Sequence, residues 1–438
     1  MEPILKKLRP LRSKSVVIDK AYGFMAHFYA DSLYRNSIYL MSSTFIMSVL
    51  GFFFWMINAR LYTPAEIGIA TTLISTSALI VNIGLLGLNS SVIRYLPTWK
   101  DKNSFINLIF FCISGASLLV AFAFVVLSAQ FAPKLHPVFL DGVFMLFFIF
   151  FIGISSINTI TDSLFISYRT AQFVLIIYTI MSISRILFAV ILPKTLPNAV
   201  FYAYAFSIII AAVLSIFFLR KYLGYRFARN WKIKELGETW RYSFSNYVSS
   251  IVAGIPTLIL PLFILNRIGS EQAAYHYIGM TIASAIFVIP QSVTQSLFSE
   301  GSHNEKELKP LVRKTLLFSV SLLSIPVVLF ILFGKYLLIL FGKDYSANVY
   351  LYLCLLTLSA YPLAVNYVCY SIVKIKKMNK ELVAVNIVNT IIFVILYFSL
   401  IRFGLMGVGF AWLSGNILAA IIYVIAVFMA FRKPTVKA

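Results

Sequence analysis

The feature that most constrains this chain is a series of apolar stretches, each about 20 residues long and separated by short polar segments. We count twelve, at 38–58, 67–91, 106–128, 139–165, 173–192, 199–219, 244–266, 273–297, 315–333, 347–373, 382–401 and 405–431. A helix of about 20 residues crosses the roughly 30 Å hydrocarbon core of a bilayer. Charged residues make up only 12% of the chain, against about 25% in soluble domains. The sequence predicts an all-α polytopic membrane protein with twelve transmembrane helices.

The distribution of Lys and Arg predicts the orientation of these helices. Of the 37 basic residues, 29 fall in segments on the same side as the N-terminus, 7 fall on the opposite side, and Arg185 lies inside a span. Cytoplasmic loops of membrane proteins are enriched in Lys and Arg. We therefore expect a multi-pass protein of the plasma membrane with both termini in the cytoplasm. The net charge of +22 is then explained by the basic cytoplasmic segments. We therefore predict no nucleic-acid partner.

The longest polar break lies in the middle of the chain and divides it into similar halves. We predict a basic tail at 1–37, a first lobe of six helices at 38–219, a basic linker at 220–243, a second lobe at 244–431 and a short tail at 432–438. The halves align at an offset near 206 residues, which pairs Arg35 with Arg241 and Arg60 with Arg267. Parallel repeats of this kind predict two lobes that enclose a substrate cavity near the membrane midplane.

Arg185 is the strongest single candidate for a binding residue. Counted from Phe173, it lies about 18 Å into a core of about 30 Å. A charged side chain at such depth is costly, by about 3 kcal/mol or more, unless it faces water or a partner. One interpretation is a cavity cation that binds an anionic group of the substrate. The other is a structural ion pair, for which Asp162 is the intramembrane candidate, although at a different depth.

Other candidate cavity residues are polar side chains that lie on one helix face or near helix ends. Gln291 and Gln295 share a face with Thr281, and Asn246 lies in the span at 244–266. These amides either line the cavity or form hydrogen bonds between helices. Arg60 and Arg267 either anchor helix ends at the membrane surface or form a basic rim on the outer side of the cavity.

Several chemistries find no support in the sequence. No His, Cys or carboxylate cluster has the spacing of a metal site or of a general acid–base pair. No glycine-rich phosphate loop is present, so we do not expect nucleotide hydrolysis. We therefore predict that the protein is not an enzyme, with no catalytic residues, no metal and no cofactor.

Several short motifs resemble the polysaccharide flippases of the multidrug/oligosaccharidyl-lipid/polysaccharide (MOP) exporter superfamily. The motifs are RNS at 35–37, GLNSS at 87–91, RYLP at 94–97, SLFSEG at 296–301 and LFGKDY at 340–345. The resemblance implies a fold like that of the MATE transporters, with two parallel six-helix repeats and alternating access. It also implies transport of an oligosaccharide carried on a polyprenyl diphosphate, for surface polysaccharide or glycan biosynthesis. Cationic cavity residues bind the diphosphate and sugar acids in such relatives, a role that would fall here to Arg185, with Arg60 and Arg267 as weaker candidates.

The partners expected on this basis are the lipid-linked oligosaccharide, membrane lipids and proteins of glycan assembly and polymerisation. The main alternative is a multidrug or metabolite exporter of the same superfamily, which would bind cationic substrates through carboxylates and aromatic rings. A membrane glycan polymerase or acyltransferase would need a catalytic set or a long outer loop. A sugar transporter of the major facilitator type would need a Gly-Asp-Arg-rich loop between its second and third helices, where this chain reads RYLPTWKDKNSF.

Overall fold

The computed structural model describes residues 32–227, 247–248, 251–252, 254–303, 308–376 and 378–432. All regular elements in these ranges are helices. The long ones are α3 (Ser32–Leu61), α4 (Pro64–Gly84), α6 (Lys102–Val126), α9 (Gly142–Ser167), α10 (Ala171–Ile191), α11 (Ala199–Leu223), α14 (Ser270–His303), α15 (Leu308–Ile339), α16 (Lys343–Leu358), α17 (Ala360–Ile375), α18 (Asn379–Leu400) and α19 (Gly404–Arg432). Shorter ones are α5 (Leu88–Tyr95), α7 (Ser128–Phe131), α8 (His136–Phe139), α13 (Leu260–Ile268), η2 (Leu96–Thr98) and η5 (Ile401–Phe403).

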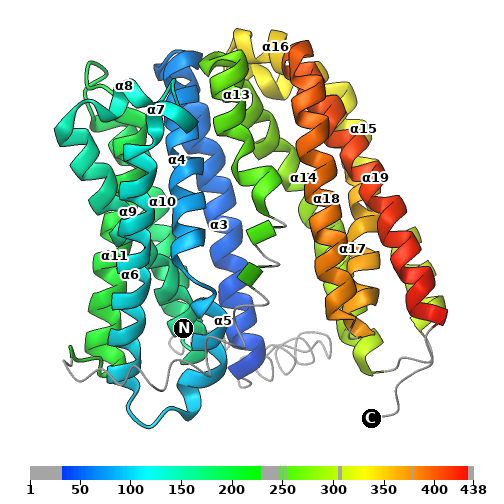
Figure 1. Ribbon diagram of the computed structural model, residues 1–438, viewed down its shortest axis with the longest axis horizontal. Coiled ribbons are helices and arrows are strands. Elements are labelled where there is room, and N and C mark those ends of the chain that lie inside the picture. The colour runs from blue at the N-terminus through cyan, green and yellow to red at the C-terminus, as the bar shows by residue number, and fades with distance from the viewer. Residues whose placement is uncertain are drawn as a thin grey trace, which may run out of the picture.

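The helices form two groups that touch at one end and diverge toward the other (Figure 1). In the first group α10 packs against α3 and α11, and α6 packs against α4 and α9. In the second group α14 packs against α15, α16 and α17, and α18 packs against α19. Helix α4 also packs along α14 and so joins the groups. We refer to the joined end, at the top of Figure 1, as the upper end, and to the other as the lower end.

Ten stretches of helix are long and apolar enough to cross a membrane in the described ranges. One of them, Lys380–Met429, contains both α18 and α19. The chain reverses between these two helices at η5 and at Gly404, whose φ is 68°, so this stretch crosses twice. The predicted span at 244–266 is only partly within the described residues and stays a prediction. The all-helical, multi-pass membrane fold predicted from the sequence is confirmed.

Short-range capping determines where several helices begin. The Thr63 hydroxyl accepts a hydrogen bond from the Glu66 N–H, and the Glu66 carboxylate accepts one from the Thr63 N–H at 2.8 Å. This reciprocal pair satisfies free N–H groups of the first turn of α4, and Pro64 fits there because it lacks an N–H. Asp101 caps α6 and Asp141 caps α9 in a similar way. These caps fix the residues at which α4, α6 and α9 begin.

The second helix ends earlier than its apolar pattern predicts. The sequence predicts one span over 67–91, but α4 ends at Gly84. Leu86 and Gly87 have φ angles of 51° and 74°, a left-handed conformation that ends the helix. The separate helix α5 follows at the lower end (Figure 1). Leu85 and Leu88 are buried in this turn, which is why hydropathy alone continues the span through it.

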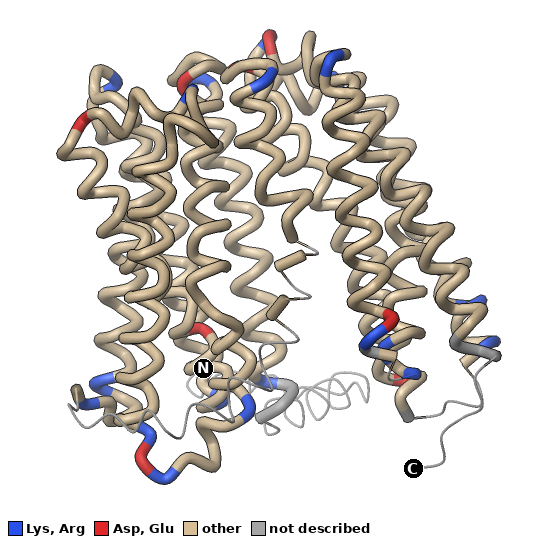
Figure 2. The backbone as a smooth tube through the Cα atoms, in the orientation of Figure 1, with Lys and Arg blue, Asp and Glu red and all other residues tan. Residues whose placement is uncertain are grey.

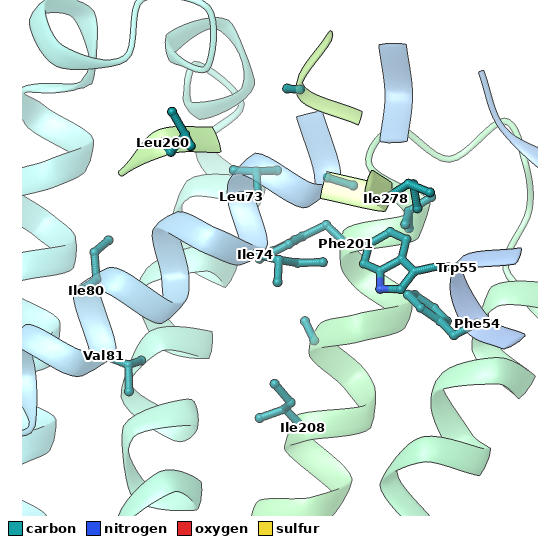
Figure 3. Close-up of a cluster of buried hydrophobic side chains, with 14 of the residues drawn as sticks. Phe54, Trp55, Leu73, Ile74, Ile80, Val81, Phe201, Ile208, Leu260 and Ile278 are labelled. Carbon is teal, nitrogen blue, oxygen red and sulfur yellow. The ribbon is translucent and has the colours of Figure 1, made fainter. Parts of the chain in front are cut away.

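Apolar side chains from both groups form one continuous core. Figure 3 shows part of it, where Leu73 and Ile74 of α4 lie among Phe54, Phe201 and Ile278. In a membrane the apolar contrast with lipid is small, so this packing contributes mainly by close van der Waals contact. Figure 2 shows the complementary pattern for charge, with most Lys, Arg, Asp and Glu at the two ends and few between them.

Candidate functional site

A cavity of about 720 Å³ lies between the two groups of helices. Its walls come from α3, α4, α9, α10 and α11 on one side and from α14 and α15 on the other. This volume is within the range of about 300–1,000 Å³ that is usual for small-molecule sites. The site therefore belongs to both halves of the chain, and a relative movement of the halves would change its access.

Arg185 is on the wall of this cavity, as the sequence predicts for a cavity cation. It lies 14 residues after Ala171 on α10, about 21 Å along the helix and closer to the upper end. Its Nε–H donates a hydrogen bond of 3.2 Å to the Ser207 hydroxyl. The guanidinium carbon lies 4.4 Å from the centre of the Tyr204 ring and 5.8 Å from that of Phe54. These contacts orient the side chain and leave part of its donor set available.

No carboxylate of the described residues forms an ion pair with Arg185. Asp162, the candidate partner from the sequence, accepts a hydrogen bond of 2.6 Å from the Tyr178 hydroxyl instead. Both residues line the cavity, and Tyr178 and Arg185 share a face of α10 at a spacing of seven residues. Neutral rings compensate only part of the free-energy cost of placing a guanidinium in the membrane interior. The remaining cost would be offset by an ionic interaction with an anionic ligand.

The polar groups of the cavity are distributed unequally between its walls. Helix α9 contributes Ser155, Asn158, Thr159 and Asp162, which are spaced along one helix face. Helix α4 adds Ser77 and Asn82. The opposite wall has the hydroxyls of Tyr277, Thr281 and Ser284 and is otherwise apolar. The first half of the chain thus offers the charged and amide groups, which suit a ligand rich in hydroxyl groups.

Two aromatic side chains of the cavity wall are in contact across the two groups of helices. The rings of Trp55 in α3 and Tyr277 in α14 are in edge contact, with centroids 4.8 Å apart. Trp55 is buried, and both residues belong to the cavity lining. This contact joins the two groups of helices at the cavity wall. It lies at about the height of Arg185, because all three residues are six or seven positions from the upper ends of their helices.

The structure places the remaining candidate residues away from the cavity lining. Gln291 and Gln295 are exposed on α14, on the continuation of the face that carries Thr281 and Ser284. Arg60 and Arg267 are exposed in the last turns of α3 and α13. The Arg60 Nε–H donates to the Leu340 carbonyl, and Arg267 lies over the rings of Phe263 and Phe398. Asn246 is outside the described residues.

Three aromatic lining residues, Trp55, Tyr204 and Tyr277, were not predicted by the sequence analysis. Aromatic residues are frequent in this chain, with 25 Tyr and 40 Phe, so no single ring is distinctive. The stripe from Ser155 to Asp162 was detectable, because its polar side chains recur at helical spacing within an apolar span.

A family model described as "Polysaccharide biosynthesis protein" matches residues 57–350. No curated protein matches the chain. Among solved structures, the chain is similar to the lipid II flippase MurJ in an inward closed conformation, with a TM-score of 0.72 and 14% identity over 89% of this chain and 87% of that one. The chain is also similar to an inward-facing multidrug resistance MATE family transporter of the MOP superfamily. The TM-score is 0.61 and the identity 15%, over 90% of this chain and 94% of that one.

The Vibrio cholerae MATE transporter VcmN gives a TM-score of 0.63 at 15% identity, over 92% of this chain and 96% of that one. At such identities these likenesses show the fold, which is that of the MOP superfamily. They confirm the resemblance that the sequence motifs indicate. With a family match that extends over most of its length, the chain belongs to the polysaccharide biosynthesis protein family.

Proposed function

We propose that the protein is a flippase that moves an oligosaccharide linked to a polyprenyl diphosphate from the cytoplasmic to the outer leaflet. The observation that carries the proposal is Arg185, a cation without an ion-pair partner among the described residues, on the wall of a cavity shared by both halves. Guanidinium groups bind phosphate and carboxylate oxygens with two parallel hydrogen bonds. Membership of a polysaccharide biosynthesis family is consistent with such a substrate.

The proposed orientation places the lower end in the cytoplasm, together with both termini. The lower loops carry Lys100, Lys102, Arg169, Arg220 and Lys221, in agreement with the enrichment of basic residues in cytoplasmic segments. The cavity then faces the leaflet in which the lipid-linked oligosaccharide is made. The polyprenyl chain stays in the bilayer while the polar head group enters between the two groups of helices. Proteins of glycan assembly and polymerisation are the further partners we propose.

This role requires transport and no bond-making chemistry, and the cavity fits it in two ways. The amide and hydroxyl groups of α4 and α9 can form hydrogen bonds with sugar hydroxyls. The rings of Trp55, Tyr204 and Tyr277 supply apolar surface for the faces of sugar rings. We propose the 1–37 tail, the 220–243 linker and the lobes at 38–219 and 244–431 as the domain organisation of the flippase.

The experiment that tests this function uses a strain that lacks the gene. We expect the lipid-linked oligosaccharide to accumulate in the inner leaflet and the surface glycan to decrease, and wild-type protein to reverse both changes. Unchanged pools of lipid-linked oligosaccharide and surface glycan would contradict the flippase proposal. If these pools are unchanged and the strain that lacks the gene becomes more sensitive to cationic drugs, the second candidate, a multidrug exporter, is favoured. The observation that supports this candidate is Asp162 on the cavity wall.

Filling the cavity should stop transport without unfolding the protein. Gly51 lines the cavity on α3, and a Cβ added there would meet no atom within 4 Å. In Gly51→Leu the new side chain occupies space that the substrate needs, so we expect transport to fall by about tenfold or more, equivalent to at least about 1.4 kcal/mol. The measurement is clearance of the lipid-linked pool by the variant at matched expression.

Gly115→Leu on α6 is the matched control for this substitution. Gly115 is also surrounded by open space but does not line the cavity. Transport by this control should remain close to wild type. Equal activity of both variants would mean that the substrate does not pass through this cavity.

A further inference from the structure

Two hydrogen bonds between the halves of the chain close the upper end, and the internal repeat relates them to each other. The first bond comes from Arg60, in the last turn of α3. Its Nε–H donates to the Leu340 carbonyl at 2.8 Å, across 280 positions in sequence. Leu340 belongs to the turn between α15 and α16. The ring of the next residue, Phe341, is in edge contact with Phe52 of α3, with centroids 5.1 Å apart.

The second bond runs in the opposite direction, from the second half of the chain to the first. Asn266, near the end of α13, donates from Nδ2 to the Phe131 carbonyl at 2.9 Å. The Lys134 N–H lies 3.4 Å from its Oδ1, as a longer second contact. Phe131 ends α7 and Lys134 lies in the turn between α7 and α8, in the segment that connects α6 to α9. The Asn266 side chain therefore holds this turn through both of its polar atoms.

The offset of 206 residues relates the two donors, because Arg60 corresponds to Asn266. The acceptor carbonyls, of Leu340 and Phe131, are 209 residues apart, and Leu340 corresponds to Lys134, whose N–H lies in the turn held by Asn266. The helices that follow, α4 from Pro64 and α14 from Ser270, begin at this offset too. In each half, the end of one helix thus holds the equivalent turn of the other half. The repeat therefore relates the two contacts through their donors and through the turns that they hold.

Between these two bonds the backbones of α4 and α14 approach closely. A Cβ built on Gly68 would overlap the Ser270 carbonyl oxygen and would lie 2.5 Å from the Ser270 carbonyl carbon. Below this contact lies the pair formed by Trp55 and Tyr277. The upper end therefore has a layer of side-chain-to-backbone bonds above a layer of backbone contact and aromatic packing. Hydrogen bonds of the upper layer can exchange with water when the halves separate.

We propose that Arg60 and Asn266 form a pseudo-symmetric pair of latches that hold the outer side closed while the cavity is open to the cytoplasm. We call the Arg60–Leu340 and Asn266–Phe131 bonds the outer latches. Each rests on one hydrogen bond of normal length at an exposed site, and the contact of Asn266 with the Lys134 N–H is longer. Loss of one latch should therefore change the ratio of closed to open molecules by about tenfold. Loss of both should shift it further, because each latch alone still joins the halves. The role of the latches in transport rests on the proposed function, whereas their effect on the separation of the two halves does not depend on it.

The test measures distances between spin labels in the full-length protein in lipid nanodiscs, after replacement of Cys112, Cys354 and Cys369. Labels at Thr195→Cys and Ala347→Cys, both exposed, report the outer separation of the halves. We expect Arg60→Met and Asn266→Leu each to add a population at longer distance, and the double variant to make it dominant. Labels at Lys221→Cys and Lys380→Cys should show the opposite change, a shorter distance, which also verifies that the variants are folded.

Arg267→Met is the matched control, because Arg267 neighbours Asn266 and is exposed, but its guanidinium lies over the Phe263 and Phe398 rings of its own half. Its distance distribution should equal that of wild type. An unchanged outer distribution in the double variant would overturn the proposal, and so would an equal shift in the control. If the labels behave as expected but the protein clears no lipid-linked oligosaccharide, the latches stand and the proposed function fails.

Discussion

Arg185→Ala is expected to reduce transport by about thirtyfold or more at normal expression. Removal of one partner of a desolvated charge interaction costs about 2–5 kcal/mol, and 1.4 kcal/mol corresponds to a factor of about ten. The partner here is the anionic group of the bound substrate, because the described residues offer Arg185 only a hydroxyl and two rings. The rate at which the lipid-linked pool is cleared measures the loss. Arg185→Lys should retain part of the activity, since it keeps the charge but loses the planar set of donors.

The stability of the same variant separates a binding role from a structural one. If Arg185 were one half of a structural ion pair, its removal would leave a buried charge and destabilise the protein by about 3–5 kcal/mol. In the structure the candidate partner, Asp162, accepts a hydrogen bond from the Tyr178 hydroxyl instead. We therefore expect Arg185→Ala to unfold at a temperature no lower than wild type. A large drop in unfolding temperature, with activity retained by the folded fraction, would assign Arg185 to structure.

Gly68→Val is expected to prevent closure of the outer side and so to abolish transport. The added atoms would overlap the Ser270 backbone, which cannot move aside as a flexible side chain can. Because Gly68 and Ser270 belong to different groups of helices, separation of the groups relieves the overlap without disturbing either one. The variant should fold but remain open to the outside, with transport lost. A cysteine at Ser48, on the cavity wall, reports this state through its reaction with a membrane-impermeant maleimide added outside the cell.

Gly84→Val shows by contrast what a clash within one group of helices does. A Cβ on Gly84 would lie 2.7 Å from the Ser117 Cα, so α4 and α6 would have to separate within the same half. We expect low yield and a reduced unfolding temperature for this variant, with no specific gain in labelling from outside. If Gly68→Val behaved like Gly84→Val, or if labelling at Ser48→Cys stayed at background, the contact between α4 and α14 would not be the closure.

How much of the fold could be predicted from the sequence depends on which interactions determine each feature. Hydropathy locates the apolar helices because the bilayer requires about 20 apolar residues per crossing, whatever the packing. It fails at the end of α4, where Leu86 and Gly87 turn the chain within an apolar run. Loop charge predicts an orientation and the repeat predicts two halves, because both can be recognised in the sequence without knowing which helices pack together.

The site could be predicted only where one residue is costly by itself. Arg185 stands out because an intramembrane charge needs a reason, and the structure places it in the cavity. Trp55 and Tyr277 do not stand out, because their role comes from a contact between helices that are far apart in sequence. The repeat suggested Arg267 as the counterpart of Arg60, whereas it is Asn266, one position earlier, that forms a hydrogen bond to the other half as Arg60 does. A shift of one residue changes the helix face, and only the three-dimensional contacts reveal it.

The most direct test of the central claim is a flipping measurement with purified protein in liposomes that contain a lipid-linked oligosaccharide. A membrane-impermeant glycosidase added outside would digest the head groups that reach the outer leaflet. The account predicts that wild-type protein raises the digested fraction from the outer-leaflet share toward completion, and that liposomes with Arg185→Ala stay close to protein-free ones. Equal digestion with wild type, Arg185→Ala and no protein would contradict it.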